Sequence, residues 1–92
     1  MSIICHNYVI EGQFDKDDLF EFAEHRASRL NLRGQFRPAH AGLIEIDLEG
    51  YEELLDMFEM AMWLGPRHAL ITSIESTQIP VFSSPKTGFL YS

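Results

Sequence analysis

The sequence predicts a single α+β domain in which a four-stranded antiparallel sheet carries two helices on one face. Three observations support this prediction. Two segments repeat apolar residues at spacings of three and four, as amphipathic helices do. Around them lie runs rich in β-branched and aromatic residues, which are typical of strands. Glycine, proline and asparagine separate these segments where turns are expected.

The first strand is expected at Ile3 to Ile10, which contains no glycine or proline. From Asp15 the apolar residues change to a helical period. Asp15 can cap the N-terminus of this helix, and Asn31 suits the left-handed position that ends it. The apolar stripe of the helix contains one basic residue and runs Leu19, Phe22, Ala23, Arg26, Ala27 and Leu30.

Two further strands, Leu32 to Arg37 and Leu43 to Leu48, are expected to form a hairpin across residues 38–42. The second of them alternates apolar and acidic residues, so the two kinds lie on opposite faces of the sheet. The apolar face contains Ile44, Ile46 and Leu48, and the acidic face contains Glu45, Asp47 and Glu49.

A second helix is expected at Tyr51 to Leu64, where Gly65 and Pro66 end it. The inward face of this helix is expected to contain four apolar residues, Leu54, Met57, Phe58 and Ala61.

A fourth strand is expected at Ala69 to Gln78 and a short closing strand at Gly88 to Tyr91, with the irregular segment Ile79 to Lys86 between them. The order is therefore β-α-β-β-α-β with one small strand appended. This is the split-βαβ or ferredoxin-like arrangement, in which both helices cover one face of an antiparallel sheet. Residues 1–92 are expected to form one domain.

The charge and composition exclude several classes of function. Fourteen acidic and seven basic residues give a net charge of −7, and the field of such a chain repels nucleic acid and anionic membranes. No apolar run approaches the ~20 residues of a membrane span. The lone Cys5 has no internal disulfide partner, and no secretory signal precedes the first strand. These features predict a cytoplasmic protein without nucleic acid, membrane or cofactor partners.

Several segments have the spacing of a known enzyme family. The chain reads GQFDKDDLF from Gly12 to Phe20 and, after the first helix, LRGQFRP from Leu32 to Pro38. This resembles the acylphosphatases, whose signature is G-x-V-Q-G-V-G-F-R, a helix, then L-x-G-x-V-R-N. Residues 42–50 (GLIEIDLEG) and 65–69 (GPRHA) likewise resemble the family's G-x-V-E-V-x-x-E-G and G-P-P-x-A. The resemblance covers nearly the whole chain and implies the ferredoxin-like fold.

The residues that the family's chemistry requires are replaced. Without gaps, the family's phosphate-binding arginine falls on Phe20 and its water-orienting asparagine on Pro38. In the family, loop glycines let backbone amides surround a phosphate. Here the corresponding loop has three carboxylates and one lysine: Asp15, Lys16, Asp17 and Asp18. The departures from the family therefore predict that the chain has no catalytic residues of the family's type.

Other chemical sites have weaker support. Arg37 and His40 are the basic residues that could approach an anion in place of the missing arginine. The acidic residues at 15–18 fit a capped helix start better than a Ca²⁺ or Mg²⁺ site, because they lack the glycine turn and bidentate glutamate of an EF-hand. The four histidines have no metal-ligand spacing, so no metal site is predicted.

The C-terminal half of the second helix is apolar nearly all round. Met60, Trp63 and Leu64 lie three and four residues apart and form one strip. Methionine and tryptophan are favoured at adaptable binding surfaces. Either a protein partner or a second copy of the chain covers this strip, or the segment Ile79 to Lys86 folds back over it.

Three functions are open at this point. The first is a non-catalytic protein of the acylphosphatase fold, a pseudoenzyme that acts through an interface on the second helix. The second is a hydrolase of acyl phosphates with relocated catalytic groups. The third is a small-ligand sensor, which rests on fold analogy alone. The acidic loop favours the first, since a phosphate site should be positive.

Overall fold

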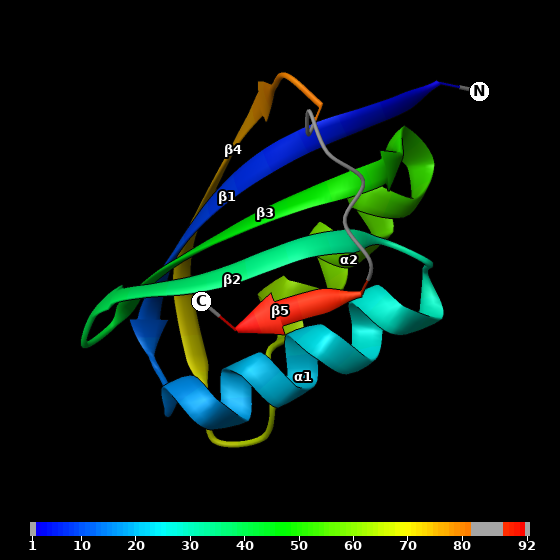
Figure 1. Cartoon of the computed structure of the whole chain (residues 1–92). Coiled ribbons are helices and arrows are strands. Elements are labelled where there is room, and N and C mark those ends of the chain that lie inside the picture. The colour runs from blue at the N-terminus through cyan, green and yellow to red at the C-terminus, as the bar shows by residue number, and fades with distance from the viewer. Residues whose placement is uncertain (1, 82–87, 92) are drawn as a thin grey trace.

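A computed structural model of the chain describes residues 2–81 and 88–91. Five strands form one sheet in the order β4-β1-β3-β2-β5, and both helices lie on the same side of it (Figure 1). The elements are β1 (Ile3–Gln13), α1 (Lys16–Arg29), β2 (Arg33–His40), β3 (Leu43–Tyr51), α2 (Glu52–Leu64), β4 (Leu70–Ile79) and β5 (Phe89–Tyr91). The predicted ferredoxin-like fold is confirmed. The appended strand β5 joins the sheet parallel to β2.

Strands β1, β2 and β3 are longer than the sequence predicts because their ends are set by pairing. β1 continues to Gln13, since Glu11 lies opposite Leu43 on β3 and Gln13 lies opposite Leu70 on β4. β2 continues to His40, which leaves a turn of only two residues before β3.

The core lies between the sheet and the two helices. Tyr8 is fully buried there, and its hydroxyl donates a hydrogen bond to the carbonyl oxygen of Leu55 over 3.2 Å. This bond satisfies the one polar group that the ring brings into an apolar layer. The other buried core residues come from both helices, from all five strands and from the turn after α1: Ile10, Leu19, Ala23, Ala27, Leu32, Phe36, Ile44, Ile46, Leu48, Leu55, Phe58, Met62, Ile71 and Phe89.

Both ends of α1 follow the sequence prediction. The side chain of Asp15 caps the helix, and Asn31 has the left-handed φ of 55° that was expected after the last turn. The three residues of the predicted stripe that are fully buried are Leu19, Ala23 and Ala27.

The predicted inward face of α2 is right at Phe58 and at the partly buried Leu54 and Ala61, but wrong at Met57. The buried residues are Leu55, Phe58 and Met62, whereas Met57 is 53% exposed. The reason is that the C-terminal half of α2 is apolar nearly all round, so its period alone does not define which side faces the sheet. The connection to β3, which ends at Tyr51 directly before the helix, fixes the rotation instead.

None of the helices in the part of the chain that the structure describes has the length and apolar character needed to cross a membrane.

Cys5 is buried in β1. Side chains alternate between the two faces along a strand, and Cys5 lies three residues before Tyr8, so it lies on the face of the sheet opposite the helices. Burial raises the pKa of this thiol from its ordinary 9.0 to about 11, and the nearby negative charges of Asp47 and Glu49 add to the shift. The thiol is therefore neutral at physiological pH and a poor nucleophile.

This shift predicts a pH dependence of stability. Between pH 9.0 and about 11 the unfolded chain releases the Cys5 proton while the folded chain keeps it. The free energy of unfolding should then fall by up to about 1.4 kcal/mol per pH unit, and this contribution should be constant below that window. Urea unfolding of the parent and of Cys5→Ala at several alkaline pH values measures the difference. Parallel curves for the two proteins would contradict the assignment.

Candidate functional site

The connection between β1 and α1 consists of Phe14 and Asp15 only. Asp15 has an extended backbone, and its Oδ1 accepts hydrogen bonds from the amide of Asp17 over 2.9 Å and from the amide of Asp18 over 3.0 Å. The free N–H groups at the start of a helix form a natural anion site. Here the chain's own carboxylate occupies two of those N–H groups.

Three of the four residues predicted to form a degenerate phosphate loop are therefore helical. Lys16, Asp17 and Asp18 make up the first turn of α1 and are exposed. The two aspartates lie where the helix dipole favours negative charge. Stabilisation of the helix therefore accounts for these acidic residues, and a bound ion is not needed to explain them.

Phe20, which the sequence resemblance places at the family's arginine position, is part of an aromatic cluster. Its ring packs edge-on against Phe36 with centroids 5.3 Å apart, stacks on Phe89 at 5.7 Å and meets Tyr91 edge-on at 5.0 Å. Phe36 contacts Phe89 and Tyr91 as well. The cluster joins α1 to β2 and β5, so Phe20 holds the last strand in place and has no donor to offer an anion.

A hollow of about 470 Å³ lies between the start of α1 and the β2–β3 hairpin. The amide of Gly12 donates to the carbonyl of Gly42 over 3.1 Å and ties the end of β1 to the hairpin turn beside the hollow. The lining residues are Phe14, Asp15, Lys16, Pro38, Ala39, His40, Ala41 and Gly42. This hollow brings together the predicted site residues Asp15, Lys16, Pro38 and His40.

Pro38 lies within β2, opposite Ile44 of β3. The fifth strand pairs only with residues 34–36 of β2, so β2 is an edge strand at Pro38 and tolerates a residue without an N–H. Pro38 has neither an N–H nor a side-chain amide, so it has no donor with which to orient a water.

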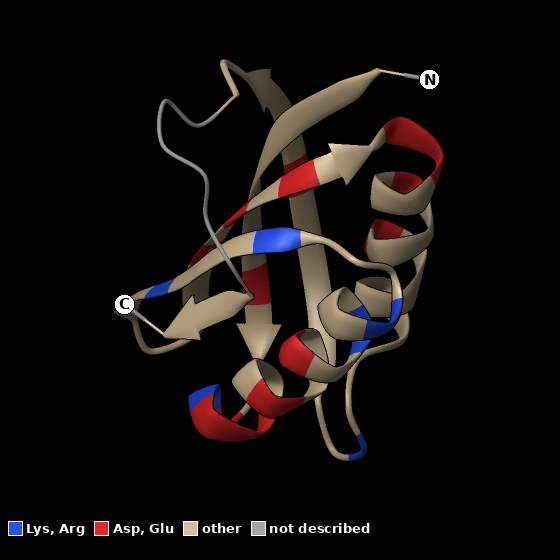
Figure 2. Ribbon diagram, turned by 45° about the vertical axis from the view of Figure 1, so that its right-hand side comes forward, with Lys and Arg blue, Asp and Glu red and all other residues tan. Residues whose placement is uncertain are grey.

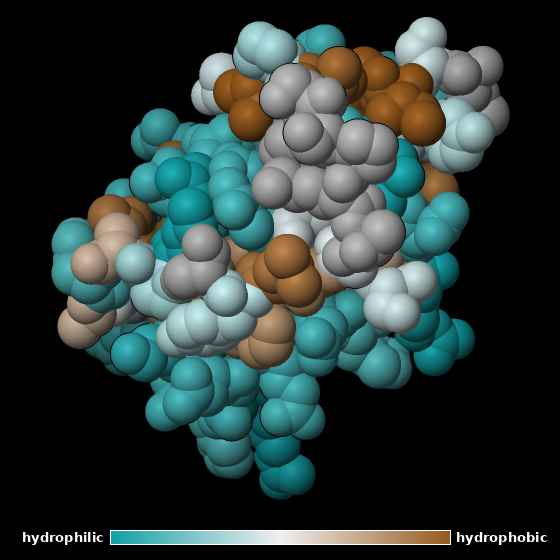
Figure 3. All heavy atoms as spheres, viewed as in Figure 1, coloured by the Kyte–Doolittle hydropathy of each residue, from teal (hydrophilic) through white to brown (hydrophobic). Residues whose placement is uncertain are grey.

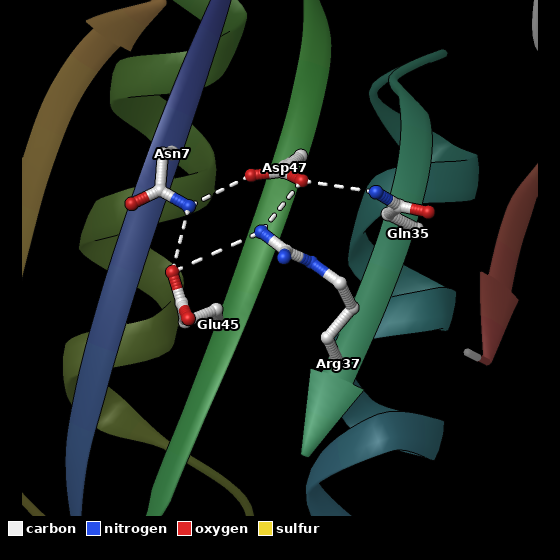
Figure 4. Close-up of polar contacts among 5 residues, drawn as sticks. All are labelled: Asn7, Gln35, Arg37, Glu45 and Asp47. Atoms are coloured by element: carbon white, nitrogen blue, oxygen red, sulfur yellow. Dashed lines mark hydrogen bonds and ion pairs between the residues drawn. The ribbon is translucent and has the colours of Figure 1, made fainter. Parts of the chain in front are cut away.

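The two basic candidates behave differently. His40 lines the hollow, and its Nδ1 lies 3.0 Å from the carbonyl oxygen of Ala41. Arg37 does not line it. Its guanidinium points across the open face of the sheet, where it lies 2.8 Å from an oxygen of Asp47 and 3.8 Å from one of Glu45 (Figure 4). Arg37 is therefore already neutralised by two carboxylates.

The contacts of Arg37 belong to a polar network that the sequence analysis missed. Asp47 is only 6% exposed, and its carboxylate accepts hydrogen bonds from Asn7 over 2.7 Å and from Gln35 over 3.0 Å. Asn7 also donates to Glu45 over 3.2 Å, and Figure 4 shows these side chains converging above β3. Alternating polar residues on two hairpin strands were the sequence signal for it. The network satisfies the buried carboxylate of Asp47, whereas the Nε of Arg37 is buried without a hydrogen-bond partner.

A larger hollow of about 1310 Å³ runs beside α1. Its lining mixes four arginines with three acidic residues: Arg26, Arg29, Arg33 and Arg67 with Asp18, Glu21 and Glu24. Arg33 is paired with Glu49 at 2.9 Å, and Arg26 lies over the ring of Phe22. Among the residues described, no group of three or more histidine, cysteine or acidic side chains is placed to hold a metal ion.

The surface predicted on the second helix is exposed. Met60, Trp63 and Leu64 are 70, 45 and 79% exposed, and Met57 adjoins them. We call these four residues the α2 strip. Pro80 and Val81, in the segment expected as an alternative cover, are themselves exposed, and residues 82–86 of that segment lie outside the described part of the chain. The face drawn in Figure 3 is the opposite one and is mostly hydrophilic.

The sheet order β4-β1-β3-β2-β5, with both helices on one side, is the ferredoxin-like arrangement of the acylphosphatase fold. The family model described as Acylphosphatase matches residues 7–89, so the chain belongs to the acylphosphatase family. The chain is 30% identical over 81 residues to the acylphosphatase of Pseudomonas aeruginosa, and the matched region covers 88% of this chain and 89% of that one. The crystal structure of the acylphosphatase from Bacillus subtilis superposes with a TM-score of 0.88 at 21% identity and 99% coverage of both chains. The acylphosphatase from Coxiella burnetii superposes with a TM-score of 0.88 at 19% identity, covering 98% of this chain and 93% of that one.

The geometry at the start of α1 predicts a difference between neighbouring aspartates. Asp15→Ala removes the acceptor of two amides and should lower the free energy of unfolding by about 1 kcal/mol. Asp17→Ala keeps the cap and should cost less than half of that, because it removes only a charge near the helix dipole. Urea unfolding of both variants gives the comparison, and equal losses would contradict the capping role of Asp15.

Proposed function

We propose that this chain is an acylphosphatase-fold protein that does not catalyse the family's reaction and acts instead through protein contacts on α2. The observation that carries the proposal is the carboxylate of Asp15 on the amides of Asp17 and Asp18. A phosphoryl group cannot use N–H groups that already bind an anion within the chain.

Electrostatics supports the same reading. A carboxylate ~5 Å from a bound phosphoryl charge costs about 3 kcal/mol at an effective dielectric constant near 20. The smaller hollow, between the start of α1 and the β2–β3 hairpin, has one lysine and one carboxylate in its lining, Lys16 and Asp15. The arginine that supplies a bidentate fork in the family is replaced by Phe20 in the aromatic cluster.

The alternative is an acyl phosphate hydrolase with relocated catalytic groups. One observation favours it: Lys16 and His40 line the same hollow. An ammonium and an imidazole could in principle hold a phosphoryl group and relay a proton. Asp15 lies on the same rim, however, and Arg37 is already paired with Asp47 and Glu45. The non-catalytic function therefore has the stronger support.

A direct assay separates the two candidates. The purified protein should hydrolyse benzoyl phosphate no faster than buffer, because Phe20 and Pro38 stand where the family has its phosphate-binding arginine and its water-orienting asparagine. The acylphosphatase of Pseudomonas aeruginosa, assayed alongside, is the positive control.

Turnover that survives repurification and disappears in His40→Ala or Lys16→Ala would overturn the non-catalytic function. Arg37→Ala is the matched control, since its guanidinium is occupied on the open face of the sheet and does not line the hollow.

A further inference from the structure

The exposed half of α2 has two parallel rows of side chains. Met57, Met60 and Leu64 lie at helical spacing along one row and are 53, 70 and 79% exposed. The adjacent row is acidic and ends in the indole of Trp63: Glu52, Asp56, Glu59 and Trp63. The α2 strip is therefore an apolar surface with carboxylates along its side.

The charge of this face is of one sign. α2 contains four acidic residues, of which Glu52 and Glu53 lie in its first turn, and no lysine or arginine. Figure 2 shows acidic positions along α2 and no basic one. The whole chain has a net charge of −7. A second copy packed on the α2 strip would bring like charges together, at a cost of several kcal/mol if they were desolvated.

We infer that the α2 strip binds a cationic amphipathic helix of another protein. The apolar side of that helix would cover Met57, Met60 and Leu64, while its lysine or arginine residues would face Asp56 and Glu59. Flexible methionine side chains beside a tryptophan adapt to such a surface, and anchors three and four residues apart are the usual form of helix recognition. This inference rests on the proposed function, because it names the kind of partner that α2 would contact.

The chain provides its own reporter for the test. Trp63 is the single tryptophan and is 45% exposed, so its fluorescence should shift to shorter wavelength when a helix covers it. The probe is a synthetic peptide of the length of α2 with leucine and lysine at helical spacing. The control peptides replace lysine by glutamate, or keep the composition and scramble the helical period.

Matched variants separate the apolar contact from general attraction. Leu64→Lys should weaken binding of the leucine–lysine peptide by about tenfold or more. Ser28→Lys introduces the same charge on an exposed position of α1 and should change binding by less than about threefold. Likewise, Asp56→Asn with Glu59→Gln should weaken binding more than Glu21→Gln with Glu24→Gln, which neutralises two charges on α1.

Binding of the leucine–lysine peptide with a blue shift of Trp63 and this pattern of variants is the expected result. Equal losses in the α1 and α2 variants, equal binding of the glutamate peptide, or a stable dimer in sedimentation whose α2 strip is already covered would each overturn the inference. If the peptide does not bind and benzoyl phosphate is not turned over, the inference of a cationic partner is overturned, whereas the proposed non-catalytic function is still supported. Turnover of benzoyl phosphate removes that function whatever the peptide does.

Discussion

In this acylphosphatase-family chain, the start of α1 depends on the hydrogen bonds that the amides of Asp17 and Asp18 donate to the carboxylate of Asp15. They start α1 at Lys16, directly after a two-residue connection. The start of the helix in turn sets which residues point to the sheet, so Leu19 enters the core and Phe20 lies beside β5. One side chain therefore stabilises the helix and fills the place where an anion would bind, and both effects follow from the same two donors.

Phe20, which the resemblance places at the family's arginine position, has a packing role in this structure. Phe20 contacts Phe36, Phe89 and Tyr91 and so links α1 to the last strand, which has only three residues and pairs with β2 alone. Aromatic contacts of this kind contribute about 0.5–1.5 kcal/mol each beyond their buried area. Phe20 thus contributes to the attachment of β5. The exposed side of α2 presents Met60 and Leu64, which are 70 and 79% exposed.

Much of the fold could be predicted from the sequence, because its signals are local or shared with the family. The cap at Asp15, the left-handed Asn31 and the alternation in β3 are properties of a few neighbouring residues. The strand ends could not be predicted, since partners far along the chain extend β1 to Gln13 and β2 to His40. The inward face of α2 was predicted correctly at Phe58 but not at Met57, because the C-terminal half of the helix is apolar nearly all round. The sequence resemblance was enough to place Phe20 and Pro38 at the family's arginine and asparagine positions. The pairing of Arg37 with Asp47 could not be predicted, because it depends on the register of β2 against β3.

The backbone amides at the start of α1 provide the most direct test of whether Asp15 prevents anion binding there. In ¹⁵N-labelled protein titrated with inorganic phosphate, the resonances of Asp17 and Asp18 should not move beyond the small, unsaturating changes that ionic strength causes throughout the chain. Their N–H groups already donate to Asp15, and the adjacent carboxylates repel the anion. A saturable shift centred on these two amides would mean that phosphate displaces the Asp15 carboxylate. That result would contradict the claim that the family's anion site is closed in this protein.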